Sequence, residues 1–148
     1  MKSVTFFVPG KPQGKARART FTNKKTGRVQ SITPENTALY ENLIKTMYIR
    51  SAHGCKFERD TAVTLVIKAQ YLPARSTSKK KMQQMLSGEI LPTKKPDIDN
   101  IVKVVADALN GVAYLDDVQV IEVNADKTYS EEEGLLVTVR EYVKEETE

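Results

Sequence analysis

One segment, residues 61 to 72, constrains the fold more than any other part of the chain. Apolar residues alternate there with other residues at a period of two, the pattern of a β-strand with one buried face. The positions expected to be buried are Val63, Leu65, Ile67 and Ala69. The segment predicts a central strand of a sheet, and its apolar face requires a packed layer against it.

Weaker patterns predict the elements around this strand. A β-branched and aromatic run at residues 4–8 predicts a first strand, and residues 118–125 and 135–143 predict two more. Helices are expected at residues 34–52, 79–84 and 98–109. With 148 residues, of which 40% are hydrophobic, the chain can bury one core. We therefore predict a single α+β (layered α/β) domain over residues 1–148, with a mixed sheet flanked by helices.

Capping signals and apolar spacing predict the ends and faces of these helices. Thr33 is the expected N-cap of the first helix, with Pro34 at its first position. Its core face would consist of Leu39, Tyr40, Leu43, Ile44 and Met47. The second helix follows the capping run Ser76-Thr77-Ser78, and Asn110-Gly111 ends the third. The buried stripe of the third would be Ile98, Ile101, Val102, Val105 and Leu109, which leaves Asp99, Lys103 and Asp107 on the opposite side.

Positive charge is concentrated near the N-terminus. Residues 1–30 contain eight Lys and Arg and no acidic residue, although the net charge of the whole chain is only +4. We call residues 9–30 the basic ribbon; its cationic residues are Lys11, Lys15, Arg17, Arg19, Lys24, Lys25 and Arg28. This concentration favours a polyanionic partner such as nucleic acid, although a solvated basic loop would have the same composition.

Other sequence features argue against several classes of protein. No apolar run reaches the roughly 20 residues of a membrane helix, and the first residues lack the apolar length of a secretory signal. A soluble, cytoplasmic protein without a membrane partner is therefore expected. Cys55 is the one cysteine, and with only His53 nearby it cannot hold a structural zinc ion. Both are interpreted as ordinary residues at a helix end.

Aspartates form two close pairs between residues 94 and 127, the segment we expect to be catalytic. Asp97 and Asp99 stand at the expected start of a helix, and Asp116-Asp117 precede a strand. Each pair could serve the fold alone, as helix caps or as a turn. Grouped carboxylates repel one another, however, and a hard divalent cation with oxygen ligands relieves the repulsion. We expect Mg²⁺ there.

The residues of this segment also carry a resemblance to a known family. They read Lys95-Pro96-Asp97-Ile98-Asp99-Asn100, then Lys103, then Asp107-Ala108-Leu109-Asn110-Gly111, then Asp116-Asp117-Val118-Gln119. This series resembles the hallmark of the RusA family of Holliday junction resolvases, and weaker similarity extends from residue 4 to about residue 140. One departure is Thr77, where many relatives carry an aromatic residue.

The resemblance implies a mixed sheet, a homodimer, and Mg²⁺-dependent paired cleavage of four-way DNA junctions in recombination and repair, with Mn²⁺ as an alternative cation. The catalytic residues would be Asp97, Asp99, Asp117 and Lys103. The metal ligands would be Asp97, Asp99, Asp116 and Asp117. The residues expected to bind DNA are Lys11, Lys15, Arg17, Arg19, Lys79, Lys80, Lys94 and Lys95.

Three alternatives share part of this evidence. A nuclease core with a PD pair and a (D/E)xK triplet needs an acidic residue two positions before a Lys, and the chain has none. A non-catalytic DNA-binding protein would use the basic ribbon and treat the aspartates as caps. A nuclease for flaps, forks or other branched DNA would have the same active-site residues, so the motif does not separate its substrate from a four-way junction.

Overall fold

Strand β4 (Val63–Tyr71) lies inside a four-stranded sheet, as its alternating sequence predicted. The strand order is β1-β6-β4-β5, with β1 at Ser3–Pro9, β6 at Gly134–Glu141 and β5 at Val120–Tyr129. β4 pairs antiparallel with β6 and parallel with β5, so the predicted mixed sheet is confirmed. The structure is a computed structural model that describes residues 1–16, 19–32 and 34–145, with the main chain alone for residues 19 and 30–32.

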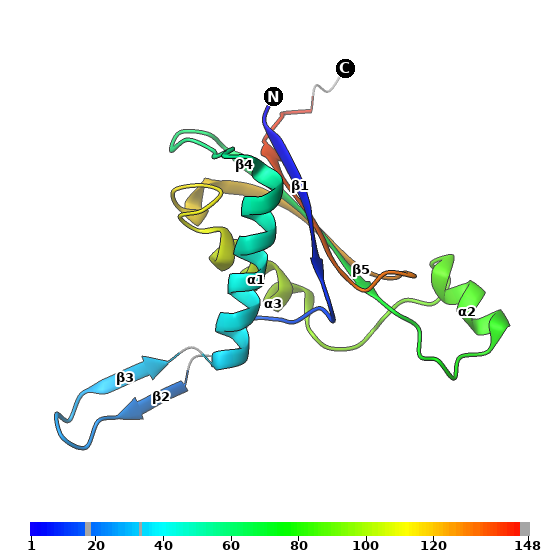
Figure 1. Ribbon diagram of the computed structural model, residues 1–148, viewed down its shortest axis with the longest axis horizontal. Coiled ribbons are helices and arrows are strands. Elements are labelled where there is room, and N and C mark those ends of the chain that lie inside the picture. The colour runs from blue at the N-terminus through cyan, green and yellow to red at the C-terminus, as the bar shows by residue number, and fades with distance from the viewer. Residues whose placement is uncertain (17–18, 33, 146–148) are drawn as a thin grey trace.

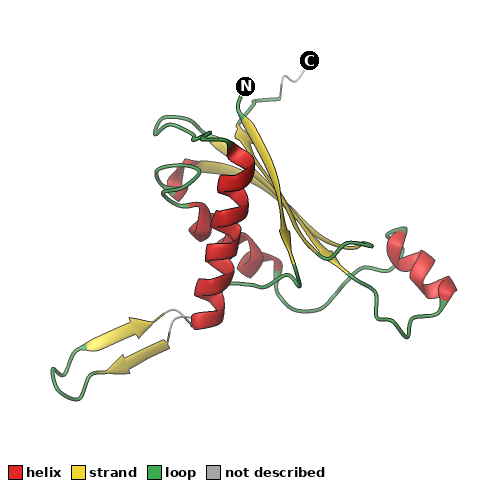
Figure 2. Cartoon of the chain, in the orientation of Figure 1, coloured by secondary structure: helices red, strands yellow, loops and turns green. Residues whose placement is uncertain are grey.

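Two helices cover one face of this sheet (Figures 1 and 2). Helix α1 (Glu35–Ala52) packs on β1 and on helix α3 (Ile98–Leu109), and α3 also contacts β5. Val63, Leu65, Ile67 and Ala69 of β4 are all 0% exposed, as their alternation predicted. The helices contribute to the same core Tyr40, Ile44, Tyr48, Ile101, Val105 and Leu109. The predicted α+β domain, with a mixed sheet and helices packed against it, is therefore confirmed.

The start and the outer face of α1 differ from the prediction. Pro34 is the N-cap residue, one position before the helix, and Thr33 lies outside the described residues. Leu39, expected in the core, is 59% exposed, because the buried face of α1 is the one that carries Tyr40 and Ile44. No helix in the described part of the chain is long and apolar enough to cross a membrane.

Helix α3 has the predicted bounds, but its buried face is turned slightly from the predicted stripe. Val104 and Ala108 are fully buried, whereas Ile98, expected in the stripe, is 37% exposed. The reason is that α3 packs against α1 as well as against the sheet, so two neighbouring rows of side chains are covered. The face that carries Asp99, Lys103 and Asp107 remains outside the core.

Two segments project from this body (Figure 1). Within the basic ribbon, β2 (Arg19–Thr22) and β3 (Val29–Ile32) form an antiparallel hairpin, which the sequence reasoning did not predict. Helix α2 (Lys79–Leu86) was predicted, and Ser78 caps it by accepting a hydrogen bond from the Lys81 N–H at 3.3 Å. No residue of α2 is buried, so this helix contributes little to the core.

Candidate active site

Helix α3 carries the first aspartate pair at its N-terminal end. Asp97 is the N-cap residue, but its side chain makes no capping hydrogen bond, and both Asp97 and Asp99 are exposed. The carboxylate of Asp97 therefore does not perform the capping role that would explain it structurally. Both aspartates lie where the positive end of the helix dipole favours an anion.

Lys103 and Asp107 follow Asp99 along one face of α3 in steps of four residues. The ion pair on this face joins Lys103 Nζ to Asp107 Oδ2 at 3.8 Å. The same carboxylate oxygen lies 3.4 Å from Nζ of Lys15, which also makes a closer contact with Glu41 of α1. Asp107 therefore connects the basic ribbon to the face that carries the predicted catalytic lysine.

The ion pairs of Lys15 are partly shielded from water, since its side chain is 19% exposed. Burial lowers the pKa of Lys15, but its hydrogen bonds to Glu41 and Asp107 and their negative charges outweigh burial and raise it. The next contact is with the catalytic segment itself, because the Lys15 N–H donates to the carbonyl oxygen of Asn100 at 2.9 Å. Lys15 thus holds the ribbon against the start of α3.

The second aspartate pair lies at a short 3-10 helix, η1 (Asp117–Gln119), directly before β5. Asp116 is its N-cap, and the Asp116 carboxylate accepts a hydrogen bond from the Val118 N–H at 3.3 Å. The expected turn before a strand is therefore present, and Asp116 has a structural role in it. Asp117, the partly buried member of the pair, is the one predicted above to be catalytic.

Gln119 fixes this turn, a role that sequence reasoning did not assign to it. Its Oε1 accepts hydrogen bonds from the N–H groups of Leu115 and Asp116, at 2.9 and 3.2 Å. Its Nε2 donates to the carbonyl oxygens of Glu58 and Thr61, at 2.7 and 3.1 Å. The side-chain amide, in a residue that is 7% exposed, thus makes the four hydrogen bonds that an amide can make. The sequence signal that could have revealed this role is the position of Gln119 at the end of the series Asp116-Asp117-Val118-Gln119.

The η1 turn lies beside α3, and the charges of the two elements act on each other. The pKa of Asp117 is raised, first by a hydrogen bond with Asp116, then by burial and by the negative charges of Asp116 and Asp107, while Lys103 opposes the shift. Burial raises the pKa of Tyr114 well above its ordinary value, and the charges of Asp117 and Asp107 add to the effect. The Tyr114 hydroxyl donates to the Ala106 carbonyl oxygen at 2.7 Å. Buried Tyr114 therefore joins the turn to the helix.

The donor types at this site fit a hard divalent cation. All the predicted ligands are carboxylates, which Mg²⁺ prefers. The raised pKa of Asp117 is a sign of negative charge that a cation would neutralise. Within residues 1–16, 19–32 and 34–145, no three Asp, Glu, His or Cys side chains are grouped closely enough to hold a metal ion. The fit therefore lies in the donor chemistry and in the contact of the η1 turn with α3.

The residues predicted to bind DNA lie in different settings. Exposed side chains are those of Lys11, Lys79, Lys80, Lys94 and Lys95. Lys15 is paired as described, Arg17 lies outside the described residues, and Arg19 is described by its main chain alone. The ammonium group of Lys94 lies 5.2 Å from the ring centroid of Tyr71 and 5.7 Å from that of Tyr129, within cation–π range.

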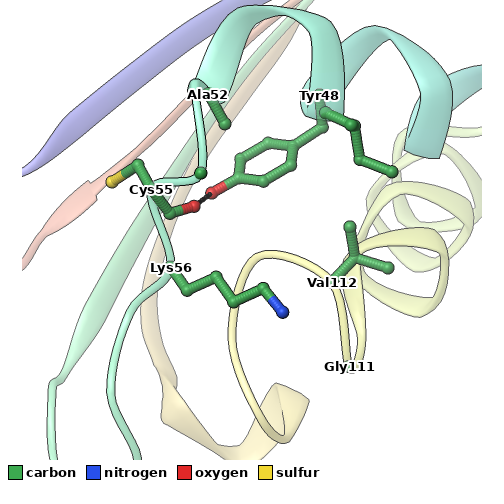
Figure 3. Close-up of a pocket in the computed structure, with 8 residues that line it drawn as sticks. Tyr48, Ala52, Cys55, Lys56, Gly111 and Val112 are labelled. Carbon is green, nitrogen blue, oxygen red and sulfur yellow. Dashed lines mark hydrogen bonds between the residues drawn. The ribbon is translucent and has the colours of Figure 1, made fainter.

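A separate apolar cavity lies at the other end of α3, between the end of α1 and the Gly111-Val112 turn (Figure 3). Its volume is about 340 Å³, and Lys56 is the charged residue among those that line it. The Tyr48 hydroxyl donates to the Cys55 carbonyl oxygen at 2.7 Å beside it. His53 is the C-cap of α1, in agreement with its interpretation as a helix-end residue. None of the predicted aspartates lines this cavity.

The fold and the site define a class of protein: a small α+β domain with carboxylates and lysines gathered along one helix, and with basic segments that project beside it. Residues 9–140 match the family model described as "Endodeoxyribonuclease RusA", and the chain therefore belongs to the RusA endodeoxyribonuclease family. It is also 34% identical, over 144 residues, to "Uncharacterized protein YqaN" of Bacillus subtilis (strain 168). That alignment covers 95% of this chain and 98% of the relative.

Proposed function

We propose that this protein is a Mg²⁺-dependent, structure-specific endodeoxyribonuclease that resolves Holliday junctions by paired hydrolysis of phosphodiester bonds in DNA recombination and repair. The observation that carries the proposal is that the η1 turn, which includes Asp117, contacts α3, the helix that bears Lys103 and Asp107. Asp117 and Lys103 are separated in the sequence, and each belongs to the motif shared with the family. The contact between their two elements supports the proposal that they act in one site.

Each proposed catalytic residue has a role that its setting allows. Asp97, Asp99 and Asp117 would hold Mg²⁺, with Asp116 beside them. When bound there, the cation supplies a water of lowered pKa and stabilises charge on the phosphate. Lys103, whose side chain is 63% exposed, can reach a phosphate oxygen and stabilise the negative charge that develops on it.

The exposed lysines on the ribbon and around the start of α3 would bind the DNA backbone. Lys11 belongs to the ribbon, while Lys94 and Lys95 directly precede the aspartate pair. Contacts of this kind position a duplex without reading its bases. A four-way junction has near two-fold symmetry and must be cut on two strands, so we propose a homodimer with one site in each subunit.

The test is cleavage of labelled four-way junction, flap and linear duplex DNA of matched sequence, each with Mg²⁺, with Mn²⁺ and with EDTA. We expect paired, metal-dependent nicks in the junction, and we expect Asp99→Asn to abolish them while junction binding persists. Asp60→Asn is the matched control, because Asp60 is exposed and lies outside the motif. Cleavage of flaps alone would keep the chemistry and change the substrate. Binding without cleavage in any metal would contradict the nuclease proposal.

A further inference from the structure

A lysine outside the predicted site holds the main chain that leads into the first aspartate pair. Nζ of Lys127, near the end of β5, donates to the carbonyl oxygen of Lys94 at 2.7 Å and to that of Pro96 at 3.2 Å. Hydrogen bonds from a charged donor are stronger than those between neutral groups. The second of these acceptors belongs to Pro96, the residue directly before Asp97. We propose that Lys127 is a positioning residue, which fixes this segment and thereby sets where the carboxylate of Asp97 lies.

Polar contacts matter here because apolar packing alone does not hold the segment. A groove of about 320 Å³ lies between residues 91–98 and the end of β5, and its lining includes Leu91, Ile98 and Lys127. Leu91 is 54% exposed and Ile98 is 37% exposed. Pro92 is buried, but residues 93–95 and 97 are exposed, and a segment with so few buried side chains is easily displaced unless hydrogen bonds restrain it. Lys127 supplies two such restraints from a strand of the sheet.

Two further contacts hold the same stretch. The ammonium group of Lys94 lies over the rings of Tyr71 and Tyr129, which end β4 and β5. On the ribbon side, a Cβ built at Gly14 would lie 3.0 Å from Pro96 Cβ and 2.8 Å from Asn100 Cβ, so the ribbon touches the segment directly. The ends of β4 and β5 and the ribbon therefore hold residues 94–97, and Lys127 bonds to their main chain.

The consequence is greatest for Asp97. Its side chain accepts no capping hydrogen bond, so nothing within α3 fixes its carboxylate. Asp99, the second residue of the helix, is held more firmly because Ile101 and Val105 of α3 are fully buried. Loss of Lys127 should therefore loosen residues 94–97, leave α3 in place, and weaken the binding of a divalent cation. The last of these effects rests on the function proposed above.

The first experiment needs no nuclease activity. Backbone ¹⁵N relaxation is measured on the protein without DNA or metal, for the wild type, Lys127→Met, Lys127→Arg and Lys68→Met. Methionine keeps the apolar stem and removes the donors, whereas arginine keeps them; Lys68 is an exposed lysine on the neighbouring strand β4. For Lys127→Met we expect order parameters at residues 94, 95 and 97 to fall from about 0.85 toward 0.6, with recovery in Lys127→Arg. Unchanged order parameters, or a loss spread over the whole chain, would overturn the proposal.

The second experiment tests whether the hydrogen bonds of Lys127 affect the binding of a divalent cation. Calorimetric titration with Mg²⁺ alone should give an affinity several-fold weaker in Lys127→Met than in Lys68→Met. Loosened residues 94–97 together with an unchanged Mg²⁺ affinity would refute the link to the metal site. If the segment loosens and the wild type cuts no DNA, the proposed function fails and the positioning role of Lys127 stands.

Discussion

Replacement of Gln119 by leucine tests how the second aspartate pair is held. Leucine fills nearly the same volume but cannot form any of the four hydrogen bonds that the amide makes with Leu115, Asp116, Glu58 and Thr61. A typical hydrogen bond contributes about 1 kcal/mol, and a buried group left without a partner costs about 1–3 kcal/mol. Some of the four backbone groups lie near the surface and can bond to water, so we expect a loss of about 2–4 kcal/mol.

Such a loss is measurable in a domain of this size. It corresponds to a fall of roughly 5–15 °C in the melting temperature, followed by circular dichroism, and to a lower urea midpoint with an unchanged slope. The matched control is Gln83→Leu, because Gln83 is an exposed glutamine on α2. If Gln119→Leu lost less than about 0.5 kcal/mol, the effect would be that of an ordinary surface substitution and our reasoning would be refuted.

A second variant separates the two halves of the amide. Gln119→Glu keeps the acceptor for Leu115 and Asp116 but turns an ionised oxygen toward the carbonyl groups of Glu58 and Thr61. Burial, these carbonyls and the nearby Asp116 all disfavour the charged form, so the folded state raises the pKa of the new carboxyl above its unfolded value. Stability relative to the wild type should therefore be greatest at acidic pH and fall as the pH rises through the folded-state pKa. A deficit that did not depend on pH would contradict this geometry.

Three further predictions concern the site and the ribbon. Gly14→Ala should destabilise the protein and reduce cleavage, because its Cβ would lie 2.8 Å from that of Asn100; urea unfolding tests this, and Gly27→Ala, where a Cβ meets nothing within 4 Å, tests the strain of positive φ alone. Asp117→Asn should stabilise the metal-free protein at neutral pH, since its raised pKa means that the charged form is disfavoured in the folded state; the gain should vanish below the unfolded pKa, as thermal melts between pH 3 and pH 8 would show. Replacing Lys24, Lys25 and Arg28 with alanine should reduce the slope of log affinity against log salt for junction DNA by about 0.9 for each phosphate that the protein no longer neutralises, and an unchanged slope would show that the hairpin does not touch DNA.

Apolar periodicity predicted the strands of the main sheet and the α-helices well, because an element that buries one face repeats its apolar residues at a characteristic spacing. The four strands of the sheet and the three α-helices lie where the pattern placed them, and the bounds of α3 match. Local spacing does not say which neighbour covers a helix, which is why Leu39 was wrongly placed in the core. The hairpin in the ribbon was not predicted, because the charged residues around Gly27 were interpreted as a binding surface. In the structure Gly27 has a φ of 69° and lies in the turn between the two strands, so this glycine was the available sequence signal.

The sequence named candidate site residues but could not show the contacts around them. The motif named Asp97, Asp99, Lys103 and Asp117, but no sequence spacing joins Lys15 to Glu41 and Asp107, which lie far along the chain. Such contacts arise from tertiary packing alone. The supporting contacts of Gln119 likewise reach the carbonyl of Glu58, in the loop before β4. The sequence therefore predicted candidate residues, and the fold shows which contacts hold them.

Two lysines share the carboxylate of Asp107, and their exposure separates their roles. Lys15 is 19% exposed and is also bound to Glu41, so its ion pairs are shielded and tie the ribbon to both helices. Lys103 is 63% exposed and lies 3.8 Å from Asp107 Oδ2, and an ion pair of that kind contributes about 0–1 kcal/mol. Lys103 can therefore leave Asp107 for a phosphate oxygen at little cost in free energy. Because Lys15 still neutralises Asp107 when Lys103 leaves, the carboxylate is not left unpaired beside Asp117, and the move is compatible with binding a phosphate at this face of α3.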